Sequence, residues 1–487
     1  MGQEYIDRLR HELKVVRHLN FSRYFITYYW IMKVVGEHQL LGNCRGSSGG
    51  SLLAYVLGIT QLDPIKHNLL FARFLSYNKK GYPDIDSDVS DREQAVKLIA
   101  AFFGEENVVP VSNFATLQLA SLCKDLARIF GVPFQLVNDY TNKMRNEAMA
   151  VAKKEPGFDA QVWQFTVEVA ERDSPSYQEF MKEMEVYPAF KDALSVLFKA
   201  QKSLSKHAGG VVITDNARAA MPLIKAKGGL QTPWPEGLAF RHLEDFGLLK
   251  FDILGLGTLR MFEQCIAKIL QRHHGIPAPS FAQIKAWFDK NLHPDNNPMT
   301  DQRVYDHVFH KGNYAGIFQF VKENTQAFMA QMKPRCVNDI ATATSLYRPG
   351  PLAAGVDKMY LENRNNPNSI VYKTPLLKEV LGDTAGLLVF QEQLQLVYHK
   401  LAGVPMDDTD GVRKAFTKKD ASNKEKAAAD REALRVDFVS KCKSVNNISE
   451  TVSGEIFDNM QKLVAYSFNK SLLESTEVNV YTKDGQY

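Results

Sequence analysis

The chain has 487 residues, of which 45% are apolar and 23% charged, so it is expected to hold two to four domains or subdomains around more than one core. The net charge of +4 permits nucleic-acid binding without requiring it. The five cysteines are scattered and form no CxxC pair, which argues against a zinc site and against disulfides. No apolar run reaches the roughly 18 residues of a membrane span, and the N-terminus is too charged for a signal peptide. A cytoplasmic protein is therefore predicted.

Two helices are predicted first, at residues 4–20, where apolar residues recur every three or four positions, and at 24–36, which are rich in aromatic side chains. Residues 42–51, GNCRGSSGGS, then form a Gly/Ser-rich turn whose N–H groups and hydroxyls suit a phosphate. Arg45 in this turn is a natural phosphate clamp. The segment from Ser51 is predicted to be a helix whose N-terminus points at the bound anion.

Arg73 follows on an otherwise apolar segment, LLFARFL. It is either a surface arginine with a buried stem or a second phosphate ligand, and the residues alone leave both interpretations open.

Three carboxylates occupy alternate positions in PDIDSD, at Asp84, Asp86 and Asp88. Alternate residues of a strand face the same side, so this spacing could stack them on one face. Unpaired, they would raise one another's pKa, and a bound divalent cation would relieve the repulsion. A solvated acidic loop and a calcium loop are the alternatives. The segment does not match the EF-hand calcium loop, because it lacks the Gly and the Glu that this pattern requires. A phosphate turn before a carboxylate strand suggests nucleotidyl transfer.

Residues 92–200 are predicted to be predominantly helical, without catalytic residues. The pattern changes at Ser205, where KHAGGVVITD indicates a Gly-Gly turn followed by a strand. His207 could be a base or a ligand, but a lone histidine before such a turn more often has a structural role. Lys250 and Asp252 then share one face of a short strand, and an Asp between Phe251 and Ile253 is costly to bury unless it is paired or metal-bound. Lys250 either pairs with it or binds a triphosphate oxygen.

Residues 258–470 are predicted to be helix-rich, with Arg348 on a rigid Pro-Gly-Pro turn. The segment GVRKAFTKK places several cations on one side of a helix, and these form either a solvated basic face or a contact with a triphosphate or a template backbone. The cations are Arg413, Lys414, Lys418 and Lys419. A charged helix at 420–445 is predicted to be exposed to solvent.

Several of these motifs, in this order, resemble the C-family replicative DNA polymerases of bacteria, the alpha subunit of DNA polymerase III, across residues 1–471. The motifs are CRGSSGGSLLAYVLGIT, LLFARFL, PDIDSD, KHAGGVVI, LLKFDILGLGTL, IFQF, LYRPGPL, FQEQ, VRKAFTKK and YSFNKS. The resemblance implies an α+β fold: a palm of the β-type nucleotidyltransferase kind with a mixed sheet and helices, a helical thumb and helix-rich fingers. The implied boundaries are 1–115 and 205–257 for the palm, 116–204 for the thumb and 258–470 for incomplete fingers.

The resemblance also implies the site residues. By motif matching, Asp84, Asp86 and Asp252 are the catalytic metal ligands, for two Mg²⁺ about 4 Å apart, with Mn²⁺ as a substitute. Asp88 matches a position that is usually acidic but is not assigned as a ligand. The nucleotide and phosphate contacts implied are Arg45, Gly46, Ser47, Arg73, Lys250, Arg348, Arg413 and Lys414.

Three departures from the family pattern are expected. The chain starts at the palm, without the PHP domain and its HxH-type metal motif, so proofreading through that domain is not expected. It stops inside the fingers, before the clamp-binding segment and the OB domain. Its last 17 residues, SLLESTEVNVYTKDGQY, resemble the opening block of an intein. Ser471 would be the splicing nucleophile, although it also completes FNKS; a divergent tail is the alternative.

The sequence therefore predicts the N-terminal part of a split polymerase that extends a primer on a template DNA with dNTPs. A second chain would bring the remaining intein and polymerase, and through it a sliding clamp could be reached. A non-templated nucleotidyltransferase, or an inert splicing precursor that is active only after ligation, are the alternatives. The host is a bacterium or, as the split gene favours, a phage-infected cell.

Overall fold

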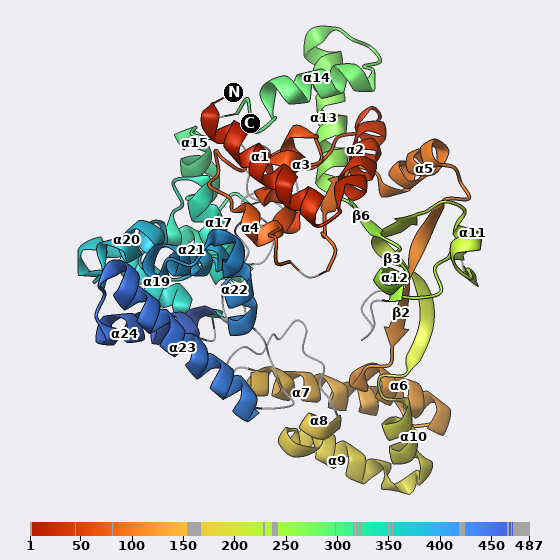
Figure 1. The fold of residues 1–487 in the computed structure, drawn as a ribbon. Coiled ribbons are helices and arrows are strands. Elements are labelled where there is room, and N and C mark those ends of the chain that lie inside the picture. The colour runs from red at the N-terminus through yellow and green to blue at the C-terminus, as the bar shows by residue number, and fades with distance from the viewer. Residues whose placement is uncertain are drawn as a thin grey trace.

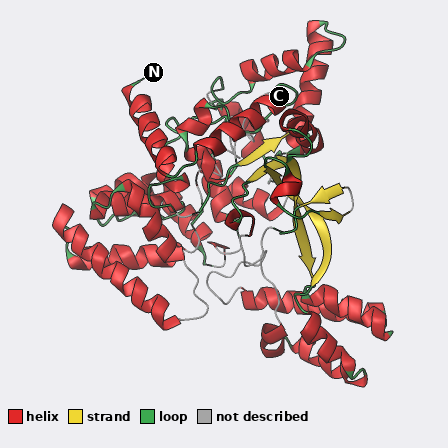
Figure 2. Ribbon diagram, turned by 45° about the vertical axis from the view of Figure 1, so that its right-hand side comes forward, coloured by secondary structure: helices red, strands yellow, loops and turns green. Residues whose placement is uncertain are grey.

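The computed structural model describes residues 2–43, 45–79, 81–152, 167–226, 229–235, 242–297, 299–314, 317, 320, 323–348, 351–352, 354–417, 424–464, 467–468 and 470. The described part is an α+β structure in which helices surround a small mixed sheet (Figure 2). Figure 1 shows the N-terminal helices beside the sheet, a helical group at the bottom of the view and the C-terminal helices on the left. None of the helices described is long and apolar enough to cross a bilayer.

The two predicted N-terminal helices are confirmed as α1, Gln3–His18, and α2, Ser22–Gly36. Asn20 separates them with a φ of +63°, a conformation that asparagine tolerates better than most residues. Both helices bury one apolar face against the sheet, and the aromatic side chains of α2, including Tyr28, are fully enclosed there.

The main sheet has four strands in the order β1-β6-β3-β2. Strands β1, Asp86–Val89, and β6, Lys250–Gly255, are parallel, whereas β3, Gln201–Ile213, is antiparallel to β6 and to β2, Val108–Thr116. Helix α5, Arg92–Phe103, packs beside β6. The chain thus crosses from β1 to its parallel neighbour β6 through more than 150 residues, which include the whole bottom group of helices.

Strand β2 is an exception to the helical prediction for residues 92–200. Pro110 and the polar residues around it weaken the local strand pattern, and the pairing with β3 decides the structure instead. Strand β3 is also longer than predicted, since it begins at Gln201. In Figure 1 the two long strands run from the sheet down to the bottom helices.

The bottom group of helices has its own apolar core. Its members are α6 (Leu119–Phe130), α7 (Phe134–Ala152), α8 (Val167–Asp173), α9 (Pro175–Glu183), the 3₁₀ turn η2 (Met184–Val186) and α10 (Ala189–Leu197).

The described part of the chain after β6 is helical, as predicted, and contributes to three further apolar cores, one of them formed mainly by α13 and α14. Its helices are α13 (Gly257–His274), α14 (Phe281–Asn291), α15 (Gln302–Val304), the π-helix η3 (Tyr305–Phe309), α16 (Glu323–Met332), α17 (Val337–Leu346), α19 (Val356–Asn365), α20 (Pro375–Leu381), α21 (Gln391–Ala402), α22 (Thr409–Thr417), α23 (Lys424–Asn446) and α24 (Glu450–Val464). The short elements of the chain are η1 (Gly46–Gly50), α3 (Leu52–Val56), α4 (Phe71–Phe74), α11 (Ala217–Ala220), β4 (Ile224–Ala226), β5 (Gly229–Gln231), α12 (His242–Asp245), η4 (Pro367–Ser369), η5 (Gly382–Thr384) and η6 (Met406–Asp408).

The expectation of a solvent-exposed charged helix at 420–445 is only partly right for α23, because one side of this helix is buried. From Asp430 onward its charged side chains are exposed or partly exposed, but Phe438 and Cys442 are fully buried against α21 and α24. Two apolar side chains one turn apart are enough to attach a mostly polar helix to a core.

Candidate active site

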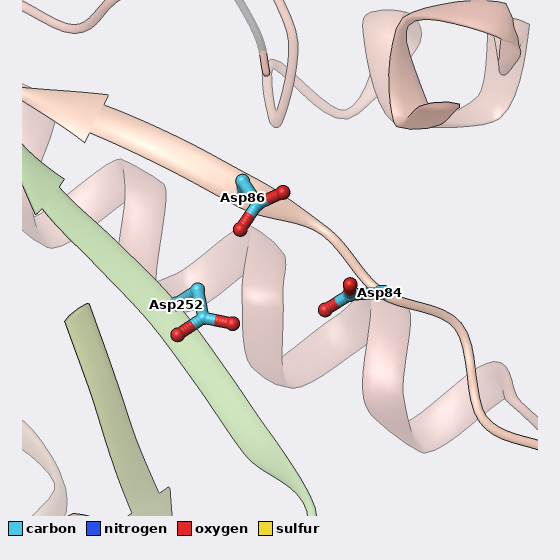
Figure 3. Close-up of side chains that lie close together, drawn as sticks. All are labelled: Asp84, Asp86 and Asp252. Atoms are coloured by element: carbon cyan, nitrogen blue, oxygen red, sulfur yellow. The ribbon is translucent and has the colours of Figure 1, made fainter. Parts of the chain in front are cut away.

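Three carboxylates meet at one end of the β1–β6 pair (Figure 3). Asp86 and Asp252 are direct partners in the parallel register, and Asp84 lies on the loop two residues before β1. One oxygen from each of the three side chains lies within 4.8 Å of the others. The sequence prediction that Asp84, Asp86 and Asp252 come together thus agrees with the geometry, whereas the expectation of Asp84, Asp86 and Asp88 stacked as one set does not.

Tyr28 fixes the two strands from the opposite side of the sheet. Its hydroxyl lies 2.8 Å from the carbonyl oxygen of Ile85 and 3.0 Å from that of Asp252, and it accepts a hydrogen bond from Ser87 at 3.1 Å. Because alternate residues face opposite sides, the apolar neighbours of the aspartates point into the core, where Phe251 stacks on Tyr24. The buried face therefore holds the carboxylates in register.

Strand β3 approaches Asp252 through two glycines. A Cβ on Gly209 would lie 2.7 Å from the Leu254 side chain and 3.2 Å from Asp252 Oδ1, so a larger residue would push the carboxylate aside. His207 Nδ1 accepts hydrogen bonds from the N–H groups of Gly209 and Gly210, at 3.2 and 2.7 Å. The predicted Gly-Gly turn is instead an irregular part of β3, where its register with β2 shifts between Lys206 and Val211. His207 stabilises this irregularity, which agrees with the structural role expected for it.

The charges around the three aspartates are unbalanced. Lys250 Nζ contacts Asp252 Oδ2 at 2.6 Å, so the predicted pairing of these two residues is present. Burial, together with the negative charges of Asp84 and Asp252, raises the pKa of Asp86 to about 6. Hard divalent cations prefer such carboxylate oxygens, and their charge would offset the repulsion. The residues present therefore fit a divalent metal ion.

The Gly/Ser turn lies directly against this group. Two isolated antiparallel bridges connect this turn and the residue before it to β1, with Leu41 opposite Val89 and Arg45 opposite Asp86. Gly46 opens η1 at a φ of +76°, and a Cβ there would lie 3.0 Å from Asp86 Oδ2. Ser47 follows within η1. Glycine is needed at position 46 both for the backbone conformation and for the space beside the carboxylate.

The expectation that the helix after Ser51 directs its N-terminus at a bound anion is wrong. Helix α3 has five residues, and the carboxylate of Glu12 already occupies its N-terminus. Glu12 is fully buried, accepts hydrogen bonds from Ser51 Oγ and from the N–H groups of Leu52 and Leu53, and pairs with Arg8 at 2.7 Å. An internal anion thus anchors the turn to α1.

A second group of cations comes from α4, α22 and the loop before Asp84. Arg73 on α4 donates to Gln391 Oε1 at 2.9 Å, and its Nε is buried without a hydrogen-bond partner among the described residues. Burial, followed by the nearby charge of Arg413, lowers the pKa of Arg73. The interpretation of Arg73 as a surface arginine with only its stem buried therefore does not fit, because the Nε of its guanidinium is buried as well.

Arg413 and Lys414 on α22 both contact the buried carboxylate of Asp410, each at 2.8 Å. Helix α22 packs against α4, so these cations face the N-terminal region and do not form a purely solvated basic face. Lys418 and Lys419 lie outside the described residues.

Lys79, five residues before Asp84, is a cation of this group that was not predicted from the sequence. Burial lowers its pKa to about 8, and the charges of Asp410, Lys414, Arg73 and Asp84 all act on it. Its Nζ donates to the carbonyl oxygen of Phe74 at 2.5 Å. The basic residues in NKKG, just before PDID, were the available signal.

Arg348 lies against a different part of the chain. Its guanidinium carbon is 4.0 Å from the ring centre of Phe468, and its Nε donates to the carbonyl oxygen of Ser345. Phe468 pairs with the start of α21, because Gln391 N–H donates to its carbonyl oxygen at 2.7 Å. The predicted splicing residue Ser471 lies outside the described residues.

Residues 1–255 match the family described as the bacterial DNA polymerase III alpha NTPase domain, and residues 278–437 match the bacterial DNA polymerase III alpha subunit finger domain. The chain is 30% identical over 474 residues to DNA polymerase III subunit alpha of Staphylococcus epidermidis, covering 96% of this chain and 40% of that protein. It is 29% identical over 473 residues to the protein of that name in Bacillus subtilis, covering 96% of this chain and 38% of the relative. The chain thus spans about two fifths of the length of these relatives.

Proposed function

Because the chain belongs to the bacterial DNA polymerase III alpha family, we propose that it performs template-directed DNA synthesis, transferring a nucleotidyl group from a dNTP to a primer 3′-hydroxyl. The observation that carries this proposal is the group of Asp84, Asp86 and Asp252 next to two sets of cations. Carboxylates that hold metals and cations that neutralise phosphates are the two requirements of phosphoryl transfer.

The three aspartates act as the metal ligands. Two divalent cations, Mg²⁺ or Mn²⁺, would lower the pKa of the primer 3′-hydroxyl and offset the negative charge of the leaving pyrophosphate. Asp86 and Asp252 hold their oxygens in fixed positions because paired strands carry them, while Asp84 comes from the preceding loop and is exposed. Lys250 pairs with Asp252 by contact with its Oδ2 at 2.6 Å.

The surrounding cations bind the triphosphate. One group comprises Arg45, Gly46 and Ser47 of the Gly/Ser turn with Lys250 of β6. The other comprises Arg73 of α4, which packs against both η1 and α22, with Lys79 and with Arg413 and Lys414 of α22. Arg73 and Lys79 support this assignment because burial lowers the pKa of each. Buried cations of this kind gain from an anionic ligand that supplies the missing negative charge and hydrogen-bond acceptors. Arg348, in a family motif, is included among the nucleotide contacts.

We assign the palm to residues 1–115 and 205–257, the thumb to 116–204 and the fingers to 258–470. The sheet that carries the aspartates supports the first assignment, and the separate core of α6–α10 supports the second. The partners in this proposal are primer–template DNA, dNTP and a second chain with the C-terminal polymerase part, through which a clamp could bind. Residues 471–487 would be the intein fragment that joins the two chains, with Ser471 as nucleophile; unchanged ligation in a Ser471→Ala variant would contradict that role.

Primer extension tests the function. The chain is mixed with a C-terminal polymerase fragment, a primed template and single dNTPs, and incorporation is expected to follow the templated base. An Asp84→Ala/Asp252→Ala variant is expected to lose extension, while Asp245→Ala, which changes an exposed aspartate of α12, keeps it. Full activity in the double variant contradicts the proposal, and incorporation that ignores the template favours a non-templated nucleotidyltransferase.

A further inference from the structure

Asp88 makes a two-point contact with Arg45 beside the carboxylate group. Arg45 Nη2 lies 3.0 Å from Asp88 Oδ1 in an ion pair that lacks hydrogen-bond geometry, so Oδ1 has no hydrogen-bond partner among the described residues. Arg45 Nε donates a hydrogen bond to Asp88 Oδ2 at 3.4 Å. The Asp88 side chain is 5% exposed, whereas that of Arg45 is 36% exposed. The buried Asp88 carboxylate thus contacts one edge of the Arg45 guanidinium, while the rest of the Arg45 side chain remains partly exposed to solvent.

The backbone explains why Asp88 meets Arg45 and not a metal ion. Arg45 lies opposite Asp86 in an isolated bridge to β1, and its guanidinium reaches Asp88 two residues further along that strand. Among the described residues, the group whose carboxylate oxygens lie within 4.8 Å of one another comprises Asp84, Asp86 and Asp252, without Asp88. Gly42 permits this arrangement, because its N–H donates to Asp88 O at 2.8 Å and a Cβ there would lie 2.7 Å from Asp88 Cβ.

The charges support the same role. Burial raises the pKa of Asp88, and Arg45 is the charge that opposes this rise. A buried carboxylate of this kind needs its partner, and the partner is thereby confined to one orientation. Arginine has a long side chain that loses rotamer freedom when it is fixed, so a preformed orientation removes part of that loss from ligand binding.

We propose that Asp88 is a positioning residue that holds the Arg45 guanidinium in place, so that its remaining N–H groups face the triphosphate of an incoming nucleotide. This inference rests on the proposed nucleotidyl-transfer function. It assigns the third aspartate of PDIDSD to phosphate recognition and removes it from the metal site.

Isothermal titration calorimetry with dATP and Mg²⁺, without primer, tests this coupling in the full chain. Wild type is compared with Asp88→Asn, Arg45→Ala and the double variant, with Ser90→Ala as a control that removes another buried polar contact at the end of β1. Asp88→Asn is expected to weaken dATP binding about tenfold, and to have no further effect when Arg45 is already alanine. Ser90→Ala should bind like wild type.

Additive losses in the double variant, or unchanged affinity in Asp88→Asn, would overturn the inference while leaving the proposed function intact.

A wild-type chain that binds no dATP would contradict the proposed function. The pairing of Asp88 with Arg45 is then tested separately, by a measurement that needs no nucleotide. That measurement is the rate of phenylglyoxal modification at Arg45, read by mass spectrometry. It should rise several-fold in Asp88→Asn, and an unchanged rate contradicts the pairing. If Asp88→Asn does not fold, Arg45→Lys keeps the buried carboxylate but loses the two-point contact, and it should show the same tenfold loss of dATP affinity.

Discussion

Asp86 and Asp252 lie opposite each other in neighbouring parallel strands, although 165 residues of sequence separate them. The pairing of β1 with β6 therefore assembles the candidate metal site from two distant parts of the chain. This relationship also explains why Asp84, on the loop outside the strand, is the exposed member of the group.

Gly46→Ala should reduce nucleotide incorporation about 100-fold, because its Cβ would displace the Asp86 carboxylate from 3.0 Å away. Gly58→Ala is the matched control. Gly58 also has a positive φ, +68°, but faces open space, so both variants carry a backbone strain of about 1 kcal/mol and differ in the contact with Asp86. Steady-state primer extension measures the difference; equal activity in the two variants would mean that the close approach does not matter.

Magnesium should stabilise the fold more at pH 7.5 than at pH 5.0. The pKa of Asp86 is raised from 3.8 to about 6, so protonation favours the folded state; this stabilisation is complete below pH 3.8 and is lost as the pH rises through 6. Above pH 6 the ionised group gains from a cation, by about 1.4 kcal/mol when free Mg²⁺ is tenfold above its Kd. Thermal melts with and without Mg²⁺ measure the effect, which Asp86→Asn should abolish.

Binding of dNTP should take up about half a proton at pH 8 through Lys79. Its pKa is lowered to about 8 by burial, so the amine is about half charged at that pH and an adjacent triphosphate would complete its protonation. It follows that dNTP affinity falls as the pH rises through 8. Calorimetry in two buffers of different ionisation enthalpy measures the uptake. Lys79→Met should show none, and identical uptake in that variant would place the proton elsewhere.

Glu12→Ala should destabilise the N-terminal region by about 3 kcal/mol, since it leaves Arg8 without its carboxylate and three buried donors without an acceptor. Glu4→Ala, on the exposed side of the same helix, should change stability by less than about 0.5 kcal/mol. Urea denaturation followed by tryptophan fluorescence compares them. Similar midpoints for both variants would show that the turn does not depend on this anchor.

The sequence predicted that Asp84, Asp86 and Asp252 lie close together, because two of them are on strands, where spacing determines which face a side chain occupies. Lys250 and Asp252 are two residues apart on β6 and contact each other, as their alternation indicated. Spacing cannot show which carboxylate of one face meets a cation from another segment. That is why Asp88 could not be separated from its neighbours on this basis alone.

The remaining differences arise from contacts between distant segments. Glu12 gave no sign in the sequence that it would occupy the start of α3, since Ser51 is 39 residues away. Strand β2 depends on its pairing with β3, and Lys79 depends on burial against residues of α22. Local patterns determine elements such as α1 and α2, whereas these features are set by tertiary packing.

Manganese binding, followed by electron paramagnetic resonance in the absence of nucleotide, tests the metal site most directly. Wild type should bind Mn²⁺ saturably, Asp86→Asn and Asp252→Asn should each weaken that binding at least about tenfold, and Asp88→Asn should leave it unchanged. Wild-type Mn²⁺ affinity in both Asp86→Asn and Asp252→Asn would contradict the assignment of these carboxylates as the metal ligands of a nucleotidyl-transfer centre.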